Sequence, residues 1–209
     1  MFVSVASLSQ LAEKLSVKAV TCEFDAARSW LQRTASSRTL SQEERRVYYG
    51  ERPWICAPKL VADGQANGFS ARPNGLIRWL EHPERNCNIE FDADDNLYTV
   101  QVKAVYYAIA NAMFHRLSHA VIYSPNEIIV KVGNGIYKAR KEAGLYKGIQ
   151  RKTAINEDNS DTCIRLCLLD DDALTRLKLS RESALSRENV PLCSEYLFRE
   201  RHGSEILRL

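Results

Sequence analysis

The sequence predicts an α+β fold in which a central mixed sheet is flanked by helices. Apolar and polar residues alternate over residues 88–103, as in a β-hairpin, and apolar residues follow helical spacing over 104–117. Short apolar runs near residues 120, 128 and 162 are typical of further strands. A helical N-terminal segment is expected to pack on one side of this sheet.

The chain is expected to contain two regions that differ in composition and secondary structure. Residues 1–83 are expected to form a helical and irregular N-terminal segment that packs on the core, because Ser, Arg, Gly and Pro are frequent over 34–83. Residues 84–209 are expected to form the α+β core. A length of 209 residues favours one compact domain overall.

The N-terminal region contains several helix signals. A capping serine precedes leucines at helical spacing, at Ser7, Leu8, Leu11 and Leu15. Further helices are expected over 22–32, 42–49 and 76–80. Residues 7–17 also resemble the first half of a helix-turn-helix, but acidic residues would lie on its groove-facing helix. A helix-turn-helix and ordinary packed helices therefore both stay open.

The best-defined unit is the predicted hairpin, with its turn at residues 93–96. On its second run, Tyr98, Val100 and Val102 face one way, and the polar residues between them face the other. If Asp92 pairs with Leu97, polar side chains of both runs share one face. That face would hold Glu90, Asp92, Gln101 and Lys103.

Helices and strands are expected to alternate after the hairpin. Strands are predicted over 120–123, 128–132 and 162–169, and helices over 104–117, 137–142, 171–185 and 194–209. Asp170 stands where it can cap the helix at 171–185.

Composition excludes several classes of protein. The longest apolar stretches fall short of the roughly 20 residues that a membrane span needs, and the N-terminus lacks the pattern of a signal peptide, so a cytoplasmic protein is expected, or one of the host cytoplasm or nucleus if it is viral. The six cysteines form no C-x-x-C pair, and reduced, mostly buried thiols are expected.

The net charge of +3 is too small to imply a polyanionic partner by itself. Basic side chains nevertheless gather between residues 138 and 152, at Lys138, Arg140, Lys141, Lys147, Arg151 and Lys152. If the partner is DNA or RNA, these side chains are expected to contact its phosphates.

The polar face of the predicted hairpin suggests metal-dependent chemistry. Carboxylates can hold Mg²⁺, and an ammonium on the same face can orient or deprotonate a water molecule. The run from Asn88 to Lys103 resembles the core hairpin of the PD-(D/E)xK nuclease superfamily, with Gln101-Val102-Lys103 in place of its Glu-x-Lys element. The resemblance implies that Lys103 and Gln101 are catalytic.

Asn88 stands where this resemblance puts the metal-binding aspartate. A neutral amide is a weaker ligand for Mg²⁺ than a carboxylate. Either Asp92 and Glu90 take over the metal, or the scaffold has lost its catalysis.

Two hypotheses for function follow. The first is a nucleic-acid-binding or nucleic-acid-processing protein whose nuclease-like, metal-dependent site is either active or has lost its activity. The second is a non-enzymatic accessory protein, of viral or mobile-element type, that engages a protein partner. An exposed hairpin whose solvent face happens to carry these polar residues is the plain structural alternative to any catalytic site.

Overall fold

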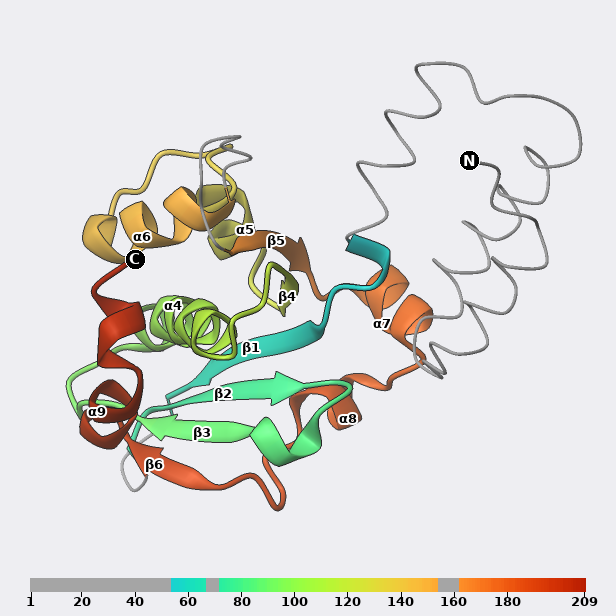
Figure 1. The fold of residues 1–209 in the computed structure, drawn as a ribbon, viewed down its shortest axis with the longest axis horizontal. Helices are drawn as coiled ribbons and strands as arrows, with labels where there is room; N and C mark the ends of the chain where they lie inside the picture. Colours follow the sequence, from blue (N-terminus) through green and yellow to red (C-terminus); the bar gives the residue numbers. More distant parts are fainter. Residues whose placement is uncertain (1–53, 67–71, 154–161) are drawn as a thin grey trace, which may run out of the picture. The chain divides into compact units, whose positions relative to one another are not determined.

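The computed structural model describes residues 54–66, 72–153 and 162–209 (Figure 1). The helices predicted over 7–17, 22–32 and 42–49 lie outside the described residues. Contacts divide the chain into two compact units, Met1–Cys56 with Arg176–Lys178, and Ala57–Thr175 with Leu179–Leu209. The second unit contains the whole sheet. Among the described residues, no helix combines the length and apolar character needed to cross a membrane.

A six-stranded mixed sheet confirms the predicted α+β class. Its strands are β1 (Lys59–Gln65), β2 (Asn74–Trp79), β3 (Cys87–Glu90), β4 (His119–Ser124), β5 (Cys163–Leu168) and β6 (Leu192–Ser194). They lie in the order β5-β4-β1-β2-β3-β6. β1, β2 and β3 form an antiparallel meander, whereas β4 runs parallel to β1, β5 parallel to β4, and β6 parallel to β3.

The strands predicted near residues 120 and 162 are confirmed as β4 and β5. The short helix predicted over 76–80 is wrong, because residues 76–79 belong to β2. Two strands of the sheet thus come from residues expected to be irregular, before the boundary proposed at residue 83.

The predicted hairpin is wrong in its second half. Its first run is strand β3, but Leu97–Phe114 is the long helix α4. Asn96 caps this helix, because its side chain accepts a hydrogen bond from the backbone N–H of Thr99. α4 packs on β1 and β2, and Figure 1 shows it between helices α6 and α9. Because α4 is covered on several sides, apolar residues occur all around it, and over 97–103 this produces an alternation like that of a strand.

A glycine sets how closely α4 approaches the sheet. A Cβ atom on Gly64 of β1 would lie 2.5 Å from the backbone nitrogen of Gln101. A Cβ atom this close to a backbone atom would clash, so the residue at this position must be glycine. The carboxyl end of β1 is therefore in direct contact with the second turn of α4.

The strand predicted over 128–132 is helix α5 (Glu127–Gly133). Its cap is Asn126, which accepts from the N–H groups of Ile128 and Ile129. The short helix predicted over 137–142 is also wrong, since helix α6 begins only at Ala143 and ends at Thr153.

The C-terminal helices follow the predicted regions with different bounds. The helix predicted over 171–185 is two helices, α7 (Asp171–Leu177) and α8 (Arg181–Leu185), and Lys178 between them takes a positive φ of 55°. The helical stretch predicted over 194–209 is confirmed as α9 (Glu195–Ile206).

Candidate functional site

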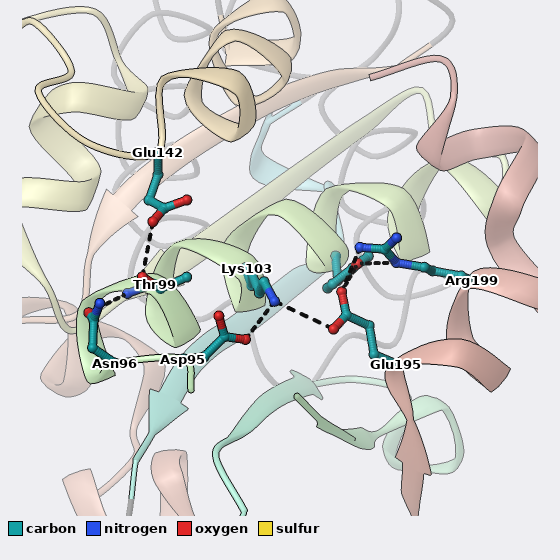
Figure 2. Close-up of polar contacts among 8 residues, drawn as sticks. Asp95, Asn96, Thr99, Lys103, Glu142, Glu195 and Arg199 are labelled. Carbon is teal, nitrogen blue, oxygen red and sulfur yellow. Dashed lines mark hydrogen bonds and ion pairs between the residues drawn. The ribbon is translucent and has the colours of Figure 1, made fainter. Parts of the chain in front are cut away.

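Lys103 lies at the centre of a half-buried polar network (Figure 2). Its Nζ donates to Asp95 Oδ2 at 2.5 Å and to Glu195 Oε2 at 3.5 Å. Only 13–15% of each of these three side chains is exposed. Asp95 precedes α4 and Glu195 begins α9, so the ammonium joins two segments that are 100 residues apart in the chain.

The other carboxylate oxygen of Glu195 accepts two hydrogen bonds. Tyr107 donates its hydroxyl at 2.5 Å and Arg199 donates Nη2 at 2.7 Å. Arg199 Nε also donates to the Tyr107 oxygen at 2.8 Å. We call the set Asp95, Lys103, Tyr107, Glu195 and Arg199 the lysine network.

The pKa values of the network follow from these contacts. Burial alone would raise the pKa of Glu195, but the Tyr107 hydrogen bond and the charges of Lys103 and Arg199 outweigh it and lower the pKa. Burial would lower the pKa of Lys103, yet the hydrogen bond to Asp95 and the charge of Glu195 leave it raised. Both groups therefore carry their full charges at neutral pH.

An acidic cluster is present here, as the metal hypothesis requires. One ligand oxygen from each of Asp92, Asp95 and Glu195 lies within 4.8 Å of the others. The residues nevertheless do not fit Mg²⁺, because Lys103 already pairs with Asp95 and Glu195, and Tyr107 and Arg199 both donate to the second carboxylate oxygen of Glu195. The exposed Asp92 is then the one carboxylate of this cluster outside the lysine network.

The structure separates the four residues that were expected to share one face. Glu90 ends β3, and its Oε2 lies 3.6 Å from Arg72 Nη1. Gln101 and Lys103 are both on α4, but two residues apart on a helix they point in different directions. Gln101 accepts from Asn126 Nδ2 at 2.8 Å. Lys103 instead belongs to the lysine network, and Asp92 lies beside that network. Their catalytic and metal-binding roles stay predictions.

A second polar cluster lies near the carboxyl end of β1, and sequence reasoning missed it. Asp63 accepts from Arg187 Nη2 at 3.1 Å, and Arg187 Nε donates to Asn74 at 2.9 Å. Both charged side chains are largely buried, with 12% of Asp63 and 21% of Arg187 exposed. An Asp-Gly pair directly after the apolar run Leu60-Val61-Ala62 was the only signal for it in the sequence.

The six predicted phosphate contacts lie on one continuous stretch, residues 138–152, which we call the basic segment. Its first half is the loop before α6, and its second half is α6 itself. Lys138, Arg140, Lys141, Lys147 and Arg151 are exposed, and Lys152 is half-buried. Lys147 and Arg151 are four residues apart on α6 and lie on the same face of the helix.

The basic segment is firmly attached to the core. Glu142 accepts from the Thr99 hydroxyl at 3.0 Å, as Figure 2 shows, and the hydroxyls of Tyr98 and Tyr146 are 2.8 Å apart. At the far end of α6, Thr153 donates its hydroxyl to the Gly133 carbonyl at 2.6 Å. The segment thus holds its cations on a fixed support next to the N-terminus of α4.

Comparisons with known proteins give distant structural similarity only. No protein-family model matches the chain, and no curated protein does. The chain is similar to RNase H1 from Halobacterium salinarum, at 10% identity and a TM-score of 0.41, over 61% of this chain and 96% of that one. It is similar to LC11-RNase H1, solved in complex with an RNA/DNA hybrid, at 15% identity and a TM-score of 0.41, over 58% and 91%.

A third similar structure is the N-terminal RNase H domain of a Mycobacterium tuberculosis protein, at 14% identity and a TM-score of 0.38, over 57% of this chain and 93% of that one. Likeness at these scores assigns no activity to the chain. The hairpin that carried the resemblance to PD-(D/E)xK nucleases is a strand followed by a helix. The resemblance to the PD-(D/E)xK superfamily is therefore wrong.

Proposed function

We propose that this protein binds nucleic acid through the phosphate backbone, using the basic segment, and that the lysine network is structural. One observation carries the proposal. Within the described part of the chain, none of the six cations of the basic segment forms an ion pair with an aspartate or glutamate side chain. Arg151 Nη1 donates to the Leu209 backbone oxygen at 3.3 Å, and like the other five cations it has no acidic side-chain partner among the described residues.

The arrangement of these cations favours a polyanion over a single small anion. Lys147 and Arg151 are one helical turn apart, and Lys138, Arg140 and Lys141 extend the same charge along the preceding loop. A row of positive charges along the chain matches the regular charges of a nucleic-acid backbone. Glu142, the one acidic side chain within the segment, is turned toward the protein by its bond to Thr99.

Metal-dependent cleavage at Asp92, Glu90, Gln101 and Lys103 is the competing proposal. It needs a divalent cation held by carboxylates that are free to bind it. The contacts of Lys103 with Asp95 and Glu195 weigh against it, as does the separate position of Gln101 beside Asn126. The proposed function is therefore binding without hydrolysis by these residues.

The test is fluorescence anisotropy of labelled oligonucleotides of about 20 nucleotides. This length exceeds the number of nucleotides that one nucleic-acid-binding domain typically covers. Duplex affinity should fall with salt, and if all six cations contact phosphates the slope of log K against log [salt] approaches about −5. The Lys147→Gln/Arg151→Gln double variant should weaken binding and reduce the slope by about 2.

The matched control is Arg72→Gln/Arg181→Gln, which removes two exposed positive charges outside the basic segment. This variant should bind as the wild type does. Equal losses in both double variants would mean that binding follows net charge and not the basic segment.

A cleavage assay with Mg²⁺ or Mn²⁺ on the same oligonucleotides separates the two proposals. We expect no cleavage by the wild type. Cleavage that disappears in Asp92→Asn and in Lys103→Met, while binding persists, would overturn the structural role of the lysine network and support the metal site.

A further inference from the structure

An exposed aromatic side chain stands at the beginning of the basic segment. Tyr137 is 51% exposed and directly precedes Lys138, and its neighbour Ile136 is 64% exposed. Large apolar side chains exposed next to each other are a feature that commonly marks a binding surface. Here they adjoin cations that have no acidic partner among the described residues.

The backbone holds Tyr137 in place. The N–H groups of Ile136 and Tyr137 both donate to the Lys131 carbonyl, at 2.8 and 3.2 Å. Gly135 provides the left-handed turn that allows this, with φ of 73°. The ring is thus presented from the end of α5 and does not belong to a free loop.

One contact of the ring is already defined. Lys131 Nζ lies 5.3 Å from the centroid of the Tyr137 ring, within the range of a cation–π contact. Lys131 is itself held by Glu127, at 2.6 Å. The side chain is therefore oriented in advance, while half of its surface stays open to solvent.

We infer that the nucleic acid bound by the basic segment is single-stranded, and that an unpaired base stacks on Tyr137. This inference rests on the proposed function. Stacking on an exposed aromatic ring needs a base whose face is free, as in single strands, whereas bases in a duplex are stacked on one another. The phosphates on one side of the stacked base then meet Lys138, Arg140 and Lys141.

A duplex would make only part of the contacts that this site offers. It offers phosphates to the cations, but no base face to Tyr137. Ile136 and Tyr137 would stay exposed in such a complex. The pairing of an aromatic platform with a row of cations is the combination by which proteins bind single strands without reading their sequence.

The experiment compares a single-stranded and a duplex oligonucleotide of equal length by anisotropy, with wild type, Tyr137→Ala and Tyr137→Phe. Tyr137→Ala should weaken single-strand binding by roughly 5- to 150-fold, the range for loss of one stacked base. Tyr137→Phe keeps an aromatic face and should retain single-strand affinity. Duplex affinity should change less than about twofold in either variant, because a duplex binds only through its phosphates.

Tyr196→Ala is the matched control, since Tyr196 on α9 is 73% exposed and lies outside the basic segment. It should leave single-strand affinity unchanged. Thermal unfolding of each variant checks that folding is retained, which the exposure of both tyrosines favours.

The outcomes distinguish the inference from the proposed function. If neither oligonucleotide binds in a way that depends on Lys147 and Arg151, the proposed function fails and the inference with it. If binding depends on those cations but Tyr137→Ala leaves single-strand affinity unchanged, or weakens duplex binding equally, the inference alone is overturned.

Discussion

The Nη2 atom of Arg187 donates to Asp63 Oδ2 at 3.1 Å, and joins strand β1 to a residue 124 positions later in the chain. The same guanidinium donates from Nε to Asn74 at 2.9 Å and from Nη1 to the Leu185 carbonyl at 3.4 Å. Its fixed planar donors thus tie two strands of the sheet to the segment that leads from α8 to β6.

Arg187→Met should destabilise the protein by about 2–4 kcal/mol, because it leaves the largely buried carboxylate of Asp63 without its cation. Urea unfolding at neutral pH measures the change in the free energy of unfolding.

The control for this variant is Arg181→Met. Arg181 also pairs with an aspartate, at 3.2 Å, but Arg181 is 51% exposed and Asp171 is 95% exposed. A surface pair of this kind contributes about 0.5 kcal/mol or less. Similar losses in the two variants would contradict the importance we give to burial of the Asp63–Arg187 pair.

Mg²⁺ should not stabilise the wild-type protein, because Lys103 occupies the position between Asp95 and Glu195 that a cation would take. Ligand binding raises the free energy of unfolding by about 0.4 kcal/mol when the free concentration equals Kd, so a smaller change at millimolar Mg²⁺ means no significant site. Unfolding in MgCl₂ is compared with NaCl of equal ionic strength.

Lys103→Met provides the complementary measurement. This variant should be less stable than the wild type, because two carboxylates lose their partner, and Mg²⁺ should restore part of the loss. Saturable stabilisation of the wild type by Mg²⁺ would show that the cluster of Asp92, Asp95 and Glu195 accepts a metal despite the lysine.

Local sequence patterns correctly predicted the strands whose own residues carry a clear signal. β4 and β5 are short, mostly apolar runs bounded by polar residues, and both were found from the sequence. α4 was partly missed, because Tyr98, Val100 and Val102 alternate with polar residues as in a strand. The helix is set instead by the Asn96 cap and by burial against β1 and β2, which become visible only in the folded chain.

The candidate sites show the same contrast between local signals in the sequence and contacts formed only on folding. The basic segment is contiguous, so its six cations can be read directly from the sequence, and their contact with phosphates stays a prediction. Asn126, Glu195 and Arg187, partners of Gln101, Lys103 and Asp63, are 25, 92 and 124 residues away in the chain, and no pattern within a short window encodes such pairs. Interactions over long sequence separation decide which polar residues lie together.

Acidification below pH 6.5 should destabilise the protein through His202. This side chain is buried, and burial lowers its pKa from the ordinary value of 6.5. Trp79 donates to Asn111 Oδ1 at 2.8 Å, so the Asn111 amide is left to donate to His202 Nε2 at 3.2 Å, and His202 Nδ1 then donates to the Phe198 carbonyl. The folded protein thus favours neutral His202.

Because the folded pKa lies below the unfolded one, the stabilisation is complete above pH 6.5 and is lost as the pH falls toward the folded value, by up to about 1.4 kcal/mol per pH unit. His115 and His119, whose pKa values burial also lowers, add to the same trend. Glu195, with its lowered pKa, affects only a lower pH range.

Urea unfolding between pH 7 and 5 measures this dependence. His202→Gln removes the titrating group, so its free energy of unfolding should depend less steeply on pH than that of the wild type. Equal slopes for the two proteins would show that His202 titrates normally in the folded state.

Gly64→Ala should destabilise the protein because β1 and α4 are in backbone contact there. The added Cβ would lie 2.5 Å from Gln101 N and 2.7 Å from both Gln101 Cα and the Val100 carbonyl carbon. These are backbone atoms of a helix, so α4 as a whole must shift away from the sheet, at a cost of about 1–3 kcal/mol or more. Gly203→Ala is the matched control, since a Cβ there meets nothing within 4 Å.

Gly203 lies inside α9, where alanine should stabilise the helix by about 0.5–1 kcal/mol. The two glycine substitutions are therefore expected to change the free energy of unfolding in opposite directions. A neutral Gly64→Ala variant in urea unfolding would mean that α4 is free to move relative to β1. In that case the close contact of Gly64 with Gln101 would not be what holds the two elements together.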